Sequence, residues 1–180
     1  MAVLDKDVIT LSSFNSVSRA DAQILILGSM PGKASLEQAQ YYAHPRNAFW
    51  SIMGQLLGFP TSLDYKTRLQ MLIDKRVALW DVMKHCERHS SLDSDIVESS
   101  VVANDFHEFL TQHKAIQLIA LNGKKAEQSF HRYVWRDLAG MFSNIEVVGL
   151  PSTSPANARM TLQEKTDYWA KHVNIPDERG

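Results

Sequence analysis

Four short apolar runs divide the chain, and each has about the length of one strand. Within each run the apolar residues occupy consecutive rather than alternate positions, which is typical of strands buried on both faces in a parallel sheet. The runs are Ala22–Leu27, Val77–Val82, Ile116–Leu121 and Ile145–Leu150. We therefore predict four parallel strands, each covered by helices on both sides.

Segments with the spacing of an amphipathic helix lie between and after these runs. They are Asn47–Leu57, Tyr65–Lys75, Asn104–His113, Lys124–Val134 and Thr161–Val173. The first stops at Gly58, a residue suited to the end of a helix, and the last begins with a Thr-x-x-Glu capping box at Thr161 and Glu164. The alternation of strand and helix predicts an α/β protein, a three-layer α/β/α sandwich with right-handed crossovers.

The composition favours one domain spanning residues 1–180. A chain of 180 residues that is 44% hydrophobic can bury one core and is short for two. Cys86 is the single cysteine, so the chain can form neither an internal disulfide nor a four-cysteine iron–sulfur cluster. No apolar run is long enough to span a bilayer, so we expect a soluble cytoplasmic protein, a monomer without membrane contact. We expect Met1–Ala20 and Asn174–Gly180 to be arms or frayed ends.

The net charge of −1 gives no global basic signature, so any surface for nucleic acid must come from local grouping of cations. Several basic residues lie in or beside the segments considered below, although each alone is also compatible with an ordinary solvated surface. They are Lys33, Arg46, Lys124, Lys125, Arg132, Arg136 and Arg159.

Three segments carry the most specific motifs of the chain: Gly-Ser-Met-Pro-Gly at Gly28–Gly32, Tyr-Tyr-Ala-His-Pro-Arg-Asn-Ala-Phe-Trp at Tyr41–Trp50, and Leu-Pro-Ser-Thr-Ser-Pro-Ala-Asn at Leu150–Asn157. Together they resemble the signature loops of the uracil-DNA glycosylase superfamily. Within it, the second motif is most similar to mismatch-specific uracil-DNA glycosylases and hypoxanthine-DNA glycosylases. The resemblance extends from about Gln23 to Trp169. It implies a four-stranded parallel sheet, damaged DNA as the partner, and no metal or cofactor.

The position of these motifs supports the resemblance. Ligands of open parallel sheets bind outside the carboxyl ends of the strands. The segments Gly28–Phe49, Asn122–Gly123 and Pro151–Asn157 follow the first, third and fourth predicted strands. All three are therefore expected at one end of the sheet.

The resemblance implies that Tyr42 stacks on a base extruded from DNA, although tyrosines at 41 and 42 are also typical packing residues. Small residues in the first loop let the backbone approach the sugar and base, and its amides can bind base oxygens. The residues of that loop are Gly28, Ser29, Met30, Pro31 and Gly32. Asn122 can donate and accept along a base edge, although Asn-Gly is also a strong turn pair.

The first loop departs from the mismatch-type pattern at Met30, where those relatives carry an asparagine that positions water. A thioether cannot replace that amide. Hypoxanthine-type relatives with a non-polar residue there are thought to use the asparagine before the helix, which corresponds to Asn47. Without the resemblance, a helix N-cap is the favoured interpretation of Asn47.

Hydroxyl and amide side chains of the last loop are suited to contacts with DNA phosphates. The expected DNA-binding residues are Ser152, Thr153, Ser154, Asn157 and His44, with a hydrogen-bonded structural role as the alternative for His44. No leucine follows Pro151 where mismatch-type enzymes place a wedge, so the residue that fills the vacated stack is open. The polar segment Arg88–Asp95 is expected to be a substrate-side loop with DNA contacts.

Other chemistries fit the sequence less well. Gly28–Ser35 is one residue too short for a phosphate-binding loop, and no Gly-x-Ser-x-Gly elbow is present. Cys86 with His85 and His89 is compatible with a metal site only by proximity. We therefore predict a monofunctional DNA glycosylase that releases hypoxanthine from deoxyinosine, with uracil release or lesion binding without catalysis as the alternatives.

Overall fold

The computed structural model describes residues 8–175, and its centre is a four-stranded parallel sheet in the order β3-β2-β6-β7. The strands are β2 (Ile24–Gly28), β3 (Val77–Asp81), β6 (Leu118–Asn122) and β7 (Glu146–Leu150). All three pairings are parallel and in continuous register. The four strands predicted from the apolar runs are confirmed.

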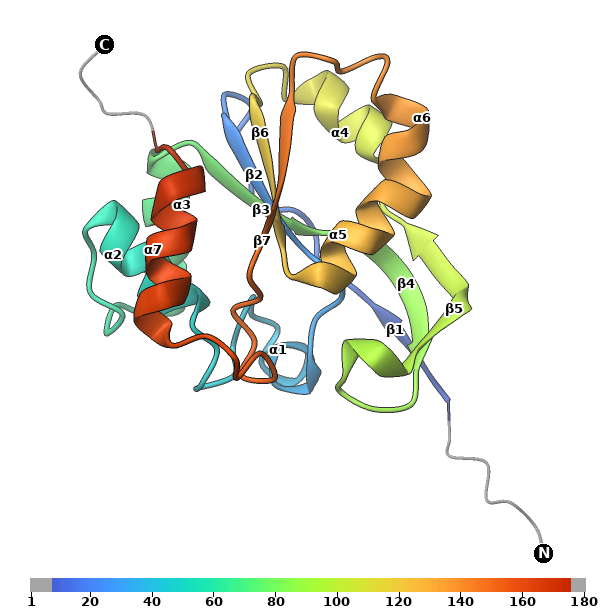
Figure 1. The fold of residues 1–180 in the computed structure, drawn as a ribbon, viewed down its shortest axis with the longest axis horizontal. Coiled ribbons are helices and arrows are strands. Elements are labelled where there is room, and N and C mark those ends of the chain that lie inside the picture. Colours follow the sequence, from blue (N-terminus) through green and yellow to red (C-terminus); the bar gives the residue numbers. More distant parts are fainter. Residues whose placement is uncertain (1–7, 176–180) are drawn as a thin grey trace, which may run out of the picture.

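Helices cover both faces of this sheet, with α2, α3 and α7 on one side and α4, α5 and α6 on the other (Figure 1). The helices are α1 (Lys33–Gln38), α2 (Phe49–Leu57), α3 (Tyr65–Asp74), α4 (Phe106–Gln112), α5 (Lys124–Phe130), α6 (Arg136–Leu138) and α7 (Leu162–His172). A π-helical turn, His131–Trp135, continues α5. The predicted three-layer α/β/α sandwich is confirmed, and α1 is an additional helix within the first loop.

Strand β2 shows why its residues are apolar at every position. Ile24 and Ile26 pack in the cluster that contains Phe49 and Trp169 of α2 and α7. The intervening Leu25 and Leu27 pack in the cluster on the opposite face with the aromatic residues of α4 and α5. Successive side chains of a strand point to opposite faces, so the five-residue strand β2 contributes residues to both clusters.

The helix ends follow the expected capping chemistry. Gly58 ends α2 with a φ of 75°, in the left-handed region that glycine adopts without strain. Thr161 and Glu164 form the predicted capping box at the start of α7.

A second sheet, with antiparallel order β1-β4-β5, was not predicted. Its strands are β1 (Ile9–Ser12), β4 (Met83–Arg88) and β5 (Ile96–Ala103). The expectation of a frayed arm before residue 20 is therefore wrong for residues 9–12, and residues 1–7 lie outside the described part. Strand β4 is mostly polar and its pairing with β5 carries two register shifts. A polar, irregular strand gives no clean period-two pattern in the sequence.

Candidate active site

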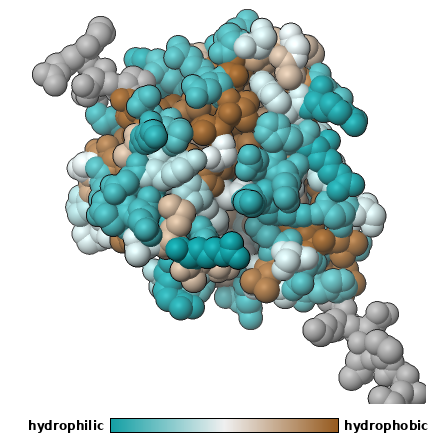
Figure 2. All heavy atoms as spheres, in the orientation of Figure 1, coloured by the Kyte–Doolittle hydropathy of each residue, from teal (hydrophilic) through white to brown (hydrophobic). Residues whose placement is uncertain are grey.

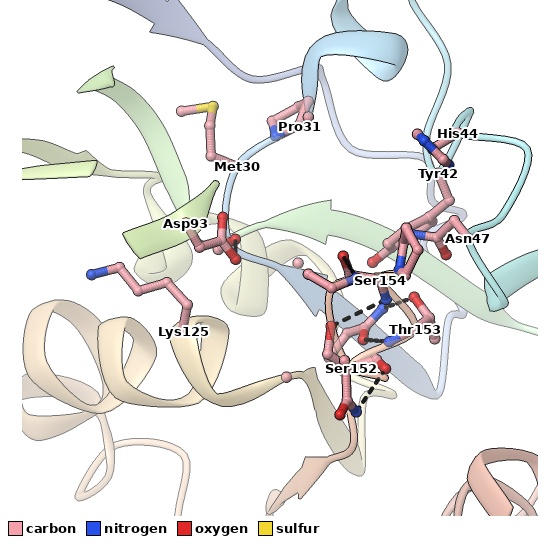
Figure 3. A pocket seen from close by; sticks show the side chains of 18 of the residues that line it. Met30, Pro31, Tyr42, His44, Asn47, Asp93, Lys125, Ser152, Thr153 and Ser154 are labelled. Atoms are coloured by element: carbon pink, nitrogen blue, oxygen red, sulfur yellow. Dashed lines mark hydrogen bonds between the residues drawn. The ribbon is translucent and has the colours of Figure 1, made fainter. Parts of the chain in front are cut away.

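The carboxyl ends of β2, β3, β6 and β7 open into one cavity of about 1190 Å³. A cavity of this size exceeds the usual range for small-molecule sites, which is roughly 300–1,000 Å³. Figure 3 shows Ser152, Thr153 and Ser154 of the last loop close to Asn47. All the residues expected to bind base or DNA line this cavity, namely Gly28, Ser29, Met30, Pro31, Gly32, Tyr42, His44, Asn47, Asn122, Ser152, Thr153, Ser154 and Asn157. The structure thus brings together residues that lie more than 120 positions apart in the chain.

Tyr42 is held rigidly with one ring face covered. Its ring stacks on Phe49 with centroids 4.0 Å apart, and it lines the cavity. The neighbouring backbone is anchored on both sides, because the Tyr41 amide donates to the Tyr65 hydroxyl and the Ala43 amide donates to Ser35 Oγ. Tyr42 itself has a φ of 54°, a conformation that costs a non-glycine residue about 1 kcal/mol or more. Strain of this kind is typical of functional positions.

Asn47 combines the two roles that the sequence left open. Its Oδ1 accepts a hydrogen bond of 3.0 Å from the Phe49 amide, so it satisfies one free N–H at the start of α2. The helix begins two residues later than predicted, at Phe49. The same side chain lines the cavity, and one contact leaves Nδ2 and a lone pair of Oδ1 for a ligand. The capping contact fixes the amide in place and does not exclude a role in binding water.

The first loop presents its backbone to the cavity, because its side chains are engaged elsewhere. The Met30 side chain packs with Met83, Cys86 and Ile96 in a small apolar cluster under the second sheet. In Figure 3 it extends away from Tyr42 and Asn47. Ser29 Oγ donates to Asp93 Oδ2 at 2.8 Å. The thioether of Met30 is therefore a core group, and any base contact by this residue is made through its backbone.

Asn122 ties the end of β6 to the last loop. Its Oδ1 accepts from the Thr153 amide and its Nδ2 donates to Thr153 Oγ1, both at 3.0 Å. A backbone amide can only donate, so this pair of contacts fixes which end of the Asn122 carboxamide is oxygen. One N–H of Nδ2 and one lone pair of Oδ1 remain for a ligand. Asn122 is therefore more than a turn residue, because its side chain bonds Thr153. The chain turns at the next residue, Gly123, which has a φ of 93°.

The prediction that Thr153 binds DNA phosphate through its hydroxyl is wrong. Thr153 is 1% exposed, and its side chain and amide are both bonded to Asn122. Its carbonyl accepts from the Ala48 amide at 2.9 Å, which joins the last loop to the start of α2. Thr153 therefore positions the two loops relative to each other and does not contact the solvent side.

The other polar residues of the last loop hold its shape and still face outward. Ser152 Oγ accepts from the Ser154 amide, Ser154 Oγ accepts from the Ala156 amide, and Asn157 Nδ2 donates to the Ser152 carbonyl. Each hydroxyl keeps its own proton to donate. Ser152, Ser154 and Asn157 are half-buried at the cavity wall, so contacts with phosphate remain a prediction for these three.

Cations surround the mouth of the cavity. Lys33, Arg46, Lys124 and Arg159 are exposed and line it, whereas Lys125 is paired with Glu98. His44 Nδ1 accepts from the Arg46 amide at 3.1 Å, which requires the proton of a neutral ring to be on Nε2. His44 therefore makes a structural hydrogen bond through Nδ1 and keeps its Nε2–H as a donor for a ligand. Hydrophilic residues cover most of the face shown in Figure 2.

Three acidic residues that were not among the predicted site residues also line the cavity, namely Asp81, Asp93 and Glu127. Asp81 ends β3 and is 4% exposed, and burial with a smaller effect of the nearby Asp93 raises its pKa to about 7. Burial also raises the pKa of Asp93, against the opposing effect of its contact with Ser29. The signal for Asp81 was present in the sequence, because it follows a buried parallel strand as Asn122 does.

The segment after β4 supports the first loop from below. Arg88 is 3% exposed and donates through Nη2 to the Pro31 carbonyl at 2.9 Å. Ser91, Leu92 and Asp93 line the cavity, so this segment borders the site as expected, but Arg88 itself is structural.

Within residues 8–175, no group of three His, Cys, Asp or Glu side chains is placed to hold a metal ion. His85 bonds Ser12 Oγ instead.

Comparison with known proteins identifies the family. A model of the "Uracil DNA glycosylase superfamily" matches residues 14–172. The chain belongs to this superfamily. The chain is 33% identical over 159 residues to a protein of Methanosarcina barkeri named "Hypoxanthine DNA glycosylase", with 88% of this chain and 94% of the relative covered. It is 34% identical over 158 residues to a protein of the same name from Methanosarcina acetivorans, with 87% and 94% covered.

A solved structure extends the comparison to three dimensions. The solution NMR structure of a protein from Methanosarcina acetivorans, described as a candidate uracil DNA glycosylase, superimposes with a TM-score of 0.74 at 32% identity. The match covers 90% of this chain and 96% of that one. The resemblance inferred from the three motifs is therefore confirmed at the level of the superfamily and of the fold. As a superfamily member with a core-facing Met30, this chain must bind water through another residue if it catalyses hydrolysis. Within the described residues, no helix is long and apolar enough to cross a membrane.

Proposed function

We propose that this protein is a DNA glycosylase that hydrolyses the bond between hypoxanthine and deoxyribose in DNA containing deoxyinosine. Membership of the superfamily and two relatives named for this activity support the proposal. The observation that carries it is the placement of Tyr42 and Asn47 in one cavity at the carboxyl ends of the strands, since one can bind the base and the other the water.

The cavity suits a nucleotide that has left the DNA stack. Enzymes that act on a base in duplex DNA must extrude it and hold it by its face and edge. Phe49 covers one face of the Tyr42 ring, so the base stacks on the opposite face. Such base–aromatic stacking contributes about 1–3 kcal/mol. The hydrogen bonds of the Tyr41 and Ala43 amides hold the strained backbone of Tyr42 in position before the base arrives.

Asn47 orients the water that attacks the sugar. As the bond from C1′ to the base nitrogen breaks, the sugar acquires positive charge and the base takes the bonding electrons. Water adds its oxygen to C1′, and its proton leaves with the base, which departs neutral. An amide is a weak base, so its contribution is to position the water rather than to deprotonate it fully. The bond from the Phe49 amide holds the Asn47 carboxamide in place for this purpose.

Damaged DNA is the proposed partner, and no metal or cofactor takes part in the proposed reaction. The exposed cations at the mouth of the cavity provide phosphate contacts that composition alone did not indicate. His44 Nε2 and the hydroxyls of Ser152 and Ser154 provide further donors. These groups set the register of the duplex so that one nucleotide faces the cavity.

The experiment that tests the function is a release assay on matched duplexes with one deoxyinosine, deoxyuridine or deoxyxanthosine, followed by alkaline cleavage at abasic sites. We expect strand breaks at deoxyinosine only after alkali, because Lys33, the lysine of the first loop, is an exposed side chain. A faster reaction at deoxyuridine would assign the chain to uracil release. Selective binding to the lesion duplexes without release of any base would show a binding protein instead.

Replacing Tyr42 tests how the base is held. We expect Tyr42→Ala to lower kcat/KM on deoxyinosine by about 10- to 100-fold, which corresponds to the loss of one stacked base. Tyr42→Phe keeps the ring and should retain most of the activity. Single-turnover rates of both variants would measure this difference. Equal losses in the two variants would show that the hydroxyl, rather than the ring face, is the group that matters.

A further inference from the structure

Beneath Tyr42, the floor of the cavity holds a carboxyl group that the proposed reaction leaves unused. Asp81 ends β3 and pairs in register with Gly28, which ends β2. A Cβ atom on Gly28 would lie 2.5 Å from Asp81 Oδ1 and 3.2 Å from the Tyr42 hydroxyl oxygen. Only glycine at position 28 therefore leaves room for the carboxyl group beside the base pocket.

Two of the polar atoms at this spot are buried without a partner among the described residues. They are Asp81 Oδ2 and the Tyr42 hydroxyl oxygen, which forms no hydrogen bond of good geometry but lies near enough to the Asn122 side chain for that contact to lower the Tyr42 pKa. More than nine in ten buried polar groups of proteins are hydrogen-bonded, so two neighbouring exceptions point to a ligand. Asp81 is also held in place from behind, because Asn104 Nδ2 donates to its backbone carbonyl at 2.8 Å. Both unpartnered residues line the cavity.

The chemistry of deaminated bases matches the groups on this floor. Hypoxanthine presents a ring N1–H donor beside its O6 acceptor, whereas adenine presents a bare N1 acceptor beside an amino donor. An ionised carboxylate can only accept, and the free N–H of Asn122 Nδ2 can only donate. Asp81 ends β3 and Asn122 ends β6, the two strands that flank β2. An acceptor and a donor from these two strand ends fit the N1–H and O6 of hypoxanthine and oppose both groups of adenine.

We propose that Asp81 determines specificity in this site: its carboxylate accepts the ring N–H of a lactam base, while Asn122 donates to the adjacent oxygen, so that deaminated bases are bound and adenine is rejected. This inference rests on the proposed function and adds the group that selects the base. Uracil and xanthine carry the same N–H beside a carbonyl, and so do guanine and thymine. This pair of contacts therefore rejects adenine and cytosine, while Tyr42 and the cavity shape select among the bases that carry the N–H.

The protonation state of Asp81 gives the inference a second signature. Its pKa is raised to about 7, so the accepting form increases from roughly a tenth at pH 6 to nine tenths at pH 8. The titratable groups whose charges act on Asp81 are Asp93, Tyr41 and Tyr42. Burial raises the pKa of both tyrosines, so neither loses its proton in this range. Burial raises the pKa of Asp93, and the hydrogen bond from Ser29 and the charges of Arg88 and Lys125 act in the opposite direction.

The test compares wild type with Asp81→Asn in single-turnover release from matched duplexes containing deoxyinosine or deoxyadenosine, and in inhibition by free hypoxanthine and free adenine. An asparagine can turn its amide to donate to N1 of adenine. We expect the preference for hypoxanthine over adenine, in rate and in inhibition constant, to fall by about tenfold or more, as for a wrong base against a bidentate pair. The wild-type rate on deoxyinosine should rise about tenfold from pH 6 to pH 8, and the variant rate should stay flat.

The control is Asp74→Asn, an exposed aspartate whose side chain bonds only Gln70. It should leave the preference and the pH profile as in wild type. If Asp81 were only structural, Asp81→Asn would change the rates on both duplexes by the same factor. The variant would then keep the preference for hypoxanthine and the same rise in rate from pH 6 to pH 8 as the wild type, and this result would overturn the inference. A wild-type protein that released no deaminated base would instead overturn the proposed function, so the two failures are distinguishable.

Discussion

Replacing Asn47 by alanine should lower the single-turnover rate of hypoxanthine release by about 100-fold or more while binding of the deoxyinosine duplex changes little. Removal of one group that acts on the transition state typically costs about 10²- to 10³-fold. Met30 cannot substitute, because its side chain is buried in the apolar cluster with Met83 and Cys86. Single-turnover rates and duplex affinity, measured on the same preparation, would separate loss of catalysis from loss of binding.

The control for Asn47→Ala must lose a similar free energy of unfolding, because Asn47 also accepts a hydrogen bond from the Phe49 amide. Loss of such a cap costs about 1 kcal/mol of stability. Asp64 makes the equivalent contact at the start of α3, where Oδ1 accepts from the Thr67 amide at 3.0 Å. Asp64→Ala should therefore cost a similar free energy of unfolding and keep full activity. If Asn47→Ala behaved in the same way, Asn47 would be a helix cap and nothing more.

The sequence was sufficient for the sheet because the central strands are buried on both faces. Runs such as Leu118–Leu121 are buried at every position, so their apolar pattern is continuous. The strand β4 is the opposite case. Lys84, His85 and Glu87 interrupt its pattern, and its bonds to two partners become evident only in three dimensions. Pattern reasoning fails where tertiary pairing decides the structure.

The candidate site shows a similar division. Positions such as Tyr42 and Asn47 could be predicted, because the motif around them is specific and each stands beside a predicted strand or helix. The pairing of Asn122 with Thr153 could not, since it joins residues 31 positions apart through side-chain atoms. A loop threonine suggests a phosphate contact in the sequence, and only its burial shows that it is a structural link. Burial also distinguishes Asp81 from the other aspartates that the structure describes.

The buried carboxyl of Asp81 should make the protein less stable, so Asp81→Asn should raise the free energy of unfolding at pH 8. Burial without a partner raises the folded-state pKa of Asp81 from its ordinary value of 3.8 to about 7. The folded state then binds the proton more tightly than the unfolded state. Stability is therefore lost as the pH rises from about 4 to about 7, and the full cost is present above pH 7.

Three pKa units correspond to about 4 kcal/mol, an upper bound for what the variant can recover at pH 8, whereas about 1.5 kcal/mol is expected at pH 5. Urea denaturation of wild type, Asp81→Asn and the control Asp74→Asn at both pH values would measure this difference. A variant that lost stability equally at the two pH values would show that the carboxyl already has a partner. A gain in stability together with a loss of discrimination against adenine would show that this group is retained at the cost of stability because it recognises the base.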